Sequence, residues 1–155
     1  MDVSFLLVYA PNAMEDRSPF YKELKELSIS HPLMVFDDFN EIRKLGERKN
    51  NCNTAPTPGM IEFEAWINDM KLFEIPVSRI NFTWYSLSHK NDKASWIDRV
   101  FVHKEWNEHF KIIKVWGLET SRSDHSYILI VCNSKDLILF PFIETLLSTI
   151  KLSIF

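Results

Sequence analysis

The fold and the place of the site are decided by one stretch of sequence, Leu33-Met34-Val35-Phe36-Asp37-Asp38-Phe39-Asn40. Its apolar half is typical of a strand that is buried on both faces of a sheet. Side chains alternate along a strand, so Asp38 and Asn40 would share one face where the strand ends. Sites in α/β proteins tend to lie at such strand ends. Asp and Asn are also ordinary turn residues, and the stretch alone is compatible with a simple turn.

Another acidic residue, Asp98, lies within residues 96–101, which are apolar apart from Asp98 and Arg99. As part of a strand, Asp98 would share a face with the apolar residues two positions away on either side. A buried carboxylate needs a donor. A histidine would serve, because the acid fixes the ring tautomer and favours its protonated form. A structural pair with Lys93 or with neighbours of Arg99 is the alternative.

The tripeptide Ser123-Asp124-His125 places an acid beside an imidazole. The two side chains could supply a metal ligand and a group that faces a phosphate. A Ser-His-Asp hydrolase triad is excluded, because three contiguous residues cannot make the mutual contacts that it requires. The other histidines are scattered without metal-ligand spacing, and we expect them on the surface or in turns: His31, His89, His103 and His109.

The chain of 155 residues is long enough to form one domain with a hydrophobic core. Its 46% of hydrophobic and 14% of aromatic residues are typical of a packed globule. The net charge of −3 weighs mildly against nucleic-acid binding, since an acidic metal site itself lowers the total. Two cysteines without zinc spacing and the lack of a signal peptide indicate an intracellular protein.

Strands that alternate with helices early and form hairpins late predict an α/β domain with a mixed sheet. A strand is expected at Val3–Tyr9, and helices are expected from Ser18-Pro19 to Ser28 and from Pro58 onward. Further strands are expected at Asn81–Ser86, Ser95–His103, Lys111–Leu118 and Ser126–Cys132, the first two as a hairpin.

The segment 136–155 is apolar, and we predict that it is an extension separate from the domain. Pro141, Glu144 and Lys151 interrupt it, whereas a membrane span needs roughly 20 mostly apolar residues. We therefore expect no membrane role.

Five motifs occur in the order found in the endonuclease/exonuclease/phosphatase superfamily: Val8-Tyr9-Ala10-Pro11-Asn12, Asp38-Phe39-Asn40, Phe82-Thr83-Trp84, Ile97-Asp98-Arg99 and Ser123-Asp124-His125. The sequence most resembles the endonuclease domain of plant non-LTR (LINE-type) retrotransposons, which share the stretch Asp38–Arg43 and the pair Glu47-Arg48. The resemblance covers about residues 3–132. It implies a DNase I-like four-layer α/β sandwich with two mixed sheets.

The resemblance also implies a fold that is truncated at its N-terminus. The family's first strands, which carry an asparagine and the main metal-binding glutamate, would precede Met1. Residues 1–135 are therefore expected to form a partial endonuclease/exonuclease/phosphatase domain. A further departure is Asp37, which stands where the family has glycine and adds a carboxylate beside Asp38.

Carried over residue by residue, the resemblance assigns catalytic roles to several side chains. Asp38 would orient or deprotonate the attacking water, with Asn40 beside it. His125 would contact the scissile phosphate and be held by Asp98. Two further residues would steady the phosphate or the developing charge, Tyr9 and Asn12.

The resemblance implies that Asp124 helps to bind a divalent metal, magnesium with manganese as a substitute. The implied function is that of a truncated metal-dependent phosphodiesterase, related to retrotransposon DNA endonucleases and weak or inactive alone. DNA would be its partner, in the nucleus if the DNA is chromosomal, and a basic loop would contribute to binding: Arg43, Lys44, Arg48 and Lys49. The alternatives are a non-catalytic remnant and a phosphatase of small phosphoesters or inositol lipids.

Overall fold

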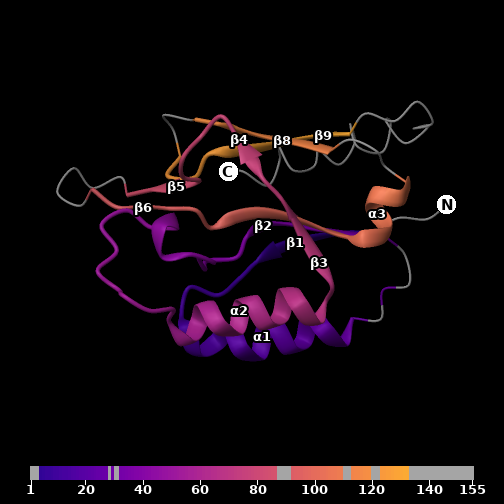
Figure 1. Cartoon of the computed structure of the whole chain (residues 1–155), viewed down its shortest axis with the longest axis horizontal. Helices are drawn as coiled ribbons and strands as arrows, with labels where there is room; N and C mark the ends of the chain where they lie inside the picture. Colours follow the sequence, from indigo (N-terminus) through magenta and orange to yellow (C-terminus); the bar gives the residue numbers. More distant parts are fainter. Residues whose placement is uncertain are drawn as a thin grey trace.

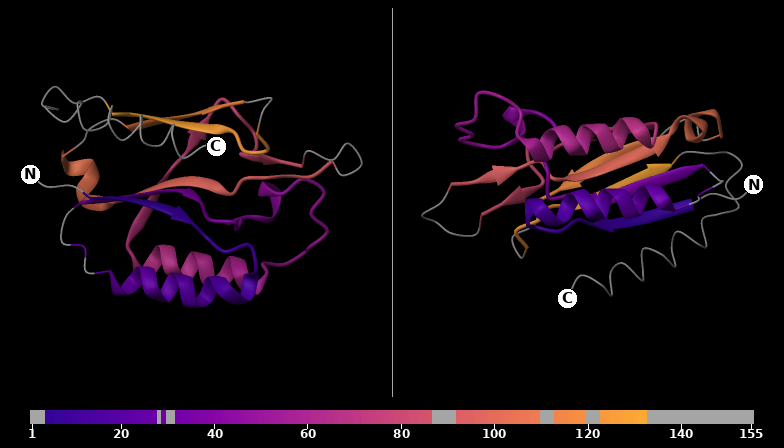
Figure 2. Two further views of the ribbon diagram at one scale, coloured as in Figure 1. Left: turned by 180° about the vertical axis from the view of Figure 1, so that it is seen from behind. Right: turned by 90° about the horizontal axis from the view of Figure 1, so that it is seen from below.

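The structure is a computed structural model that describes residues 4–27, 29, 32–86, 92–109, 113–119 and 123–132. In this part of the chain, two helices cover one face of a four-stranded sheet, and a three-stranded sheet lies against the other face (Figure 1, Figure 2). Both sheets contain parallel and antiparallel pairs. The two mixed sheets that the sequence predicts are therefore present.

The four-stranded sheet has the order β1-β2-β7-β3. Its strands are β1 (Ser4–Tyr9), β2 (Leu33–Asp38), β7 (Asp98–His103) and β3 (Leu72–Ile75). β2 runs parallel to β1 and antiparallel to β7, and its register places Asp38 opposite Asp98. The end of β2 and the start of β7 thus meet at one edge of the sheet.

The three-stranded sheet joins β4 (Val77–Ser78), β8 (Ile113–Leu118) and β9 (Tyr127–Cys132). A separate pair joins β5 (Trp84–Tyr85) to β6 (Ala94–Ser95). The predicted hairpin is therefore much shorter than expected. The single strand predicted at Ser95–His103 is divided, because the chain leaves β6 and enters another sheet at β7.

The first helix, α1 (Met14–Glu26), begins before the residues predicted to start it, and the prediction of a start at Ser18-Pro19 is wrong. Arg17 explains the earlier start. Its guanidinium donates to the carbonyl of Pro11 at 2.9 Å and to the carbonyl of Asn12 at 2.7 Å, which ties the first turn to the preceding loop. Pro19 lies inside the helix, where its fixed φ suits the helix but it cannot donate to the carbonyl four residues earlier.

The second helix, α2 (Pro58–Asp69), begins where the sequence predicts. The Thr57 hydroxyl caps it by accepting from the Met60 N–H at 3.3 Å, and Pro58 occupies the first position. The apolar residues at helical spacing are buried, as expected for a face that packs on the sheet. Two short helices complete the described elements, η1 (Leu45–Glu47) and α3 (Lys104–His109).

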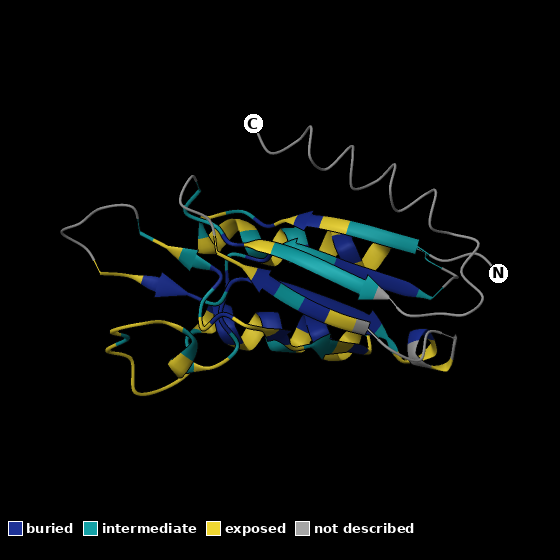
Figure 3. Ribbon diagram, turned by 90° about the horizontal axis from the view of Figure 1, so that it is seen from above, coloured by how far each residue is buried: buried dark blue, intermediate teal, exposed yellow. Residues whose placement is uncertain are grey.

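Hydrophobic clusters fill both faces of the four-stranded sheet. Five rings pack together between that sheet and the helices, with centroid separations from 5.1 to 6.3 Å: Tyr21, Phe39, Phe63, Trp66 and Phe101. A second cluster lies between the two sheets and includes Met34, Val100, Val102, Trp106 and Val115. β7 is accordingly buried over nearly its whole length, whereas β9 of the outer sheet is mostly intermediate in exposure (Figure 3). The central strands are held from both sides where they approach the site.

Among the described residues, no helix combines the length and the apolar character that a membrane crossing requires. The predicted apolar extension, residues 136–155, lies outside the described residues.

Gly59, in the first turn of α2, lies so close to Glu41 that an added side chain would displace the buried carboxylate that pairs with Arg17. An added Cβ would lie 2.3 Å from Glu41 Oε2. We expect Gly59→Ala to lower the free energy of unfolding by about 1–3 kcal/mol through overpacking, although alanine is the better helix former. Urea denaturation would measure the change. Gly46→Ala is the matched control, since an added Cβ there meets no described atom within 4 Å. Equal stability of the two variants would contradict the prediction.

Candidate active site

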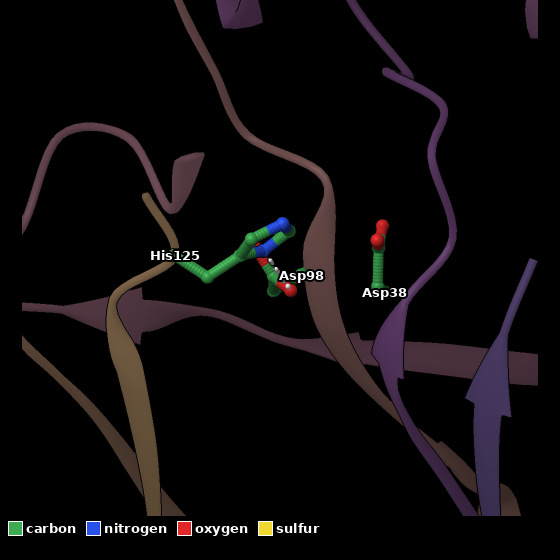
Figure 4. A group of neighbouring side chains, drawn as sticks. All are labelled: Asp38, Asp98 and His125. Carbon is green, nitrogen blue, oxygen red and sulfur yellow. Dashed lines mark hydrogen bonds and ion pairs between the residues drawn. The ribbon is translucent and has the colours of Figure 1, made fainter. Parts of the chain in front are cut away.

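Three of the predicted site residues come together where the two sheets meet. Asp38 ends β2, Asp98 begins β7, and His125 lies just before β9. Each offers one ligand atom, and these atoms all lie within 4.8 Å of one another. Figure 4 shows that the three side chains reach this position from three separate segments of the chain. The structure thus unites residues that are far apart in the sequence.

His125 and Asp98 form a direct pair. His125 Nδ1 lies 3.1 Å from both carboxylate oxygens of Asp98, which is buried. The hydrogen bond to Asp98 is the main cause that raises the pKa of His125 from 6.5 to about 9, and burial opposes it. The ring is therefore protonated at neutral pH, so both ring nitrogens are donors. Nδ1 faces Asp98, and Nε2 remains as the donor for a bound anion.

Asp38 is the second carboxylate of the cluster and is only 4% exposed. Its Oδ1 accepts a hydrogen bond from the Asn40 N–H at 2.7 Å. Burial, and then the nearby charge of Asp98, raise the pKa of Asp38 from 3.8 to about 6. A carboxylate whose pKa lies this close to neutrality is suited to accept a proton.

The Asn40 side chain is hydrogen-bonded to the loop that precedes α1. Its side-chain amide donates to the Ala10 carbonyl at 2.6 Å, and the Ala10 N–H donates to the Asp38 carbonyl at 2.8 Å. The residue has a positive φ of 51°, which asparagine tolerates better than most residues. Asn40 therefore fixes the backbone around Asp38 through its amide nitrogen.

Tyr9 and Asn12, the residues predicted to steady a phosphate, lie at the end of β1 and in the loop that follows it. Tyr9 is the partner of Asp38 in the β1–β2 register and is 71% exposed. Asn12 is exposed in the loop after β1. Both therefore lie on the chain segment next to Asp38.

Asp124, the predicted metal ligand, lies outside the cluster of three. Its Oδ2 accepts a hydrogen bond from the Trp84 indole Nε1 at 3.0 Å, and its backbone carbonyl accepts from the Tyr85 N–H at 2.8 Å. One carboxylate oxygen of Asp124 is therefore engaged by β5, a contact that the sequence did not indicate.

The donor atoms of the cluster fit a small divalent cation. Asp38 and Asp98 bring two buried carboxylates together, and such oxygen ligands are those that magnesium and manganese prefer. The Nδ1 atom of His125 faces Asp98, so this nitrogen is engaged within the cluster. The carboxylates are thus the groups that would hold a cation.

Two of the four cations in the predicted basic loop are already paired with acids. Arg43 Nη2 lies 2.7 Å from Glu64 Oε1 and Arg43 Nη1 lies 2.7 Å from Glu74 Oε2. Lys49 forms an ion pair with Asp92. The loop therefore presents less free positive charge to DNA than its sequence indicates.

Asp37 adopts a backbone conformation that favours glycine, with a φ of 103° inside β2. Such strain costs about 1–3 kcal/mol, so we expect Asp37→Gly to raise the free energy of unfolding by about 1 kcal/mol. Asp37→Ala is the matched comparison, since it removes the charge but keeps the strained Cβ. Urea denaturation would measure the free energy of unfolding of both variants. A glycine variant that is no more stable than the alanine variant would refute the prediction.

The raised pKa of His125 predicts a pH-dependent contribution to stability. The folded-state pKa of about 9 lies above the ordinary 6.5, so the stabilisation is complete below pH 6.5 and is lost as the pH rises to about 9. We expect the difference in free energy of unfolding between the wild type and His125→Gln to shrink across this range. Urea denaturation at several pH values, without metal, would measure it. A difference that stays constant would show that the pair with Asp98 does not stabilise the fold.

Comparisons with known proteins agree with this architecture. No family model matches the sequence, and no curated protein matches it. Among solved structures, the chain is similar to the endonuclease domain of TRAS1, a telomere-specific non-LTR retrotransposon, with a TM-score of 0.56 and 11% sequence identity. The match covers 84% of this chain and 56% of that chain, so this protein spans little more than half of the length of the solved domain. The chain has a DNase I-like α/β fold, with an acidic cluster that could hold a metal.

Proposed function

We propose that this chain is a metal-dependent phosphodiesterase domain that acts on DNA, related to the endonucleases of plant LINE-type retrotransposons. The observation that carries the proposal is the Asp98–His125 pair with Asp38 beside it. It is supported by the five motifs in family order and by the structural similarity to a retrotransposon endonuclease domain.

The arrangement suits the hydrolysis of a phosphodiester, which needs an activated water and neutralisation of charge on the phosphate oxygens. Asp38 would accept a proton from the attacking water. His125 would donate from Nε2 to a non-bridging oxygen, while Asp98 holds the ring and keeps it protonated. Magnesium or manganese, held by the carboxylates of Asp38 and Asp98 with Asp124 as a further ligand, would supply further neutralisation of the phosphate charge when bound. Tyr9, Asn12 and Asn40 would line the approach to the phosphate.

We further propose that residues 1–135 are a partial domain of this kind and act weakly alone, in the nucleus if the substrate is chromosomal DNA; an inactive chain is the second candidate below. The chain spans little more than half of the solved domain that it matches. A non-catalytic remnant is the second candidate function. The strained Asp37 and the engagement of Asp124 by Trp84 favour it, since both alter groups that the reaction would use.

Nicking of supercoiled plasmid DNA in the presence of magnesium, with chelator as the control, tests the proposal. A parallel assay with p-nitrophenyl phosphate and inositol phosphates, with DNA as competitor, separates nuclease from phosphatase activity. Metal-dependent nicking supports the proposal. Hydrolysis of small phosphoesters alone would favour the phosphatase, and inactivity in both assays would favour the remnant.

A further inference from the structure

The two partners of the Asp98–His125 pair belong to different sheets. Asp98 begins β7 of the four-stranded sheet, whereas His125 lies two residues before β9 of the three-stranded sheet. Within the described residues these two sheets share no strand pairing and meet through side chains. Something else must therefore set the separation of the two residues at the site.

Thr83 holds the Asp98 side of the pair. Its side chain is fully buried, and its hydroxyl oxygen accepts hydrogen bonds from the backbone N–H of Ile97 at 3.0 Å and of Asp98 at 2.9 Å. The same hydroxyl lies 3.5 Å from the Ser95 carbonyl, to which it can donate. A threonine hydroxyl offers one donor and two acceptor sites, so this one is saturated. It satisfies the backbone where the chain passes from β6 to β7.

The backbone of Thr83 holds the other side of the pair. The Ser126 N–H donates to the Thr83 carbonyl at 2.7 Å, and Trp84 forms an isolated bridge with His125. The Tyr85 N–H donates a further hydrogen bond to the Asp124 carbonyl of the same segment. One residue thus contacts the segment that carries Asp98 through its side chain and the segment that carries His125 through its main chain.

We propose that Thr83 is a positioning residue that sets the distance between Asp98 and His125. The hydroxyl is the part that acts, because two buried N–H groups beside Asp98 depend on it and each is costly to leave without a partner. The effect of Thr83 on the distance between Asp98 and His125 can be tested without any assay of activity. An effect of Thr83 on catalysis rests on the proposed function.

Thr83→Val tests the proposal, because valine has nearly the same shape and lacks the hydroxyl. The readout is the low-field proton NMR signal of the His125 Nδ1–H in its bond to Asp98, assigned by its loss in His125→Gln. We expect Thr83→Val to lose or broaden this signal at neutral pH, and Thr83→Ser to retain it. If the wild type nicks DNA, the valine variant should be slower and the serine variant close to the wild type.

Val102→Ala is the matched control, since Val102 is buried on the same face of β7 as Asp98 and lies towards the strand's other end. It should lose stability and keep the His125 signal. A signal that survives in folded Thr83→Val, or that disappears equally in Val102→Ala, would overturn the proposal. A wild type that shows the signal without nicking would count against the proposed function alone.

If Thr83→Val does not fold, hydrogen exchange of the wild type decides the question. Amide protons of Ile97 and Asp98 that exchange as slowly as those in the middle of β7 would support the hydrogen bonds to Thr83. Free exchange of these two amides in the folded protein would overturn the proposal.

Discussion

Replacement of His125 with alanine is expected to lower the rate of plasmid nicking by at least about 100-fold, within the range of a lost acid–base group or a lost donor to a developing charge. The reason is the pair with Asp98, which keeps the ring protonated and leaves Nε2 as the ring donor for a phosphate. First-order rate constants for loss of supercoiled plasmid, measured under saturating magnesium, would give the ratio directly.

His103→Ala is the matched control for this experiment. His103 ends β7 at the far side of the strand from Asp98, and it lies outside the cluster of three. We expect this variant to nick at the wild-type rate. Equal rates for His125→Ala and the wild type would show that the observed nicking comes from another site or from a contaminating nuclease.

Replacement of Arg99 with methionine is expected to cost about 3–5 kcal/mol of unfolding free energy, the usual result of removing one partner from a buried ion pair. Arg99 is fully buried, and its guanidinium binds Glu74 Oε1 at 2.6 Å and also Glu47. The same group donates to the Trp96 carbonyl at 3.0 Å. Methionine fills a similar volume but leaves Glu47 without its cation, and it leaves Glu74 paired with Arg43 alone. Urea denaturation at neutral pH would measure the loss.

Lys25→Met provides the comparison for Arg99→Met. Lys25 pairs with Asp69 at the surface, where such pairs contribute less than about 1 kcal/mol. The variant Arg99→Met with Glu47→Gln should recover part of the lost stability, because it removes the acid that is left without its cation. A similar small effect for Lys25→Met and Arg99→Met would mean that the buried network does not stabilise the fold.

The elements predicted correctly from the sequence are those whose signals lie within a few neighbouring residues. The apolar run before Asp37 forms β2, and the helix predicted from Pro58 onward is α2. Predictions that needed long-range contacts were weaker. The start of α1 depends on contacts of Arg17 with the preceding loop, and the division between β6 and β7 depends on which sheet each half joins.

At the site, too, local sequence signals were informative and long-range contacts were not. A carboxylate inside an apolar strand required a donor, and the structure places His125 beside Asp98. The contact between Asp124 and Trp84 could not be inferred, because it depends on how β5 meets the turn before β9. Asp37 was visible in the sequence as a departure from a family glycine, but its positive φ is visible only in the backbone.

The register that places Asp38 opposite Asp98 has a consequence for the order of events during synthesis. Asp38, Asp98 and His125 lie on segments that are synthesised one after another. A nascent chain that ends before residue 125 therefore cannot contain the cluster. Contacts between such distant segments also form slowly, because a long loop must be closed before they are gained. Until then, the strand edges and apolar faces of β1 and β2 stay open to other chains. Expression of this protein should therefore benefit from slow translation or from chaperones that bind unfinished sheets.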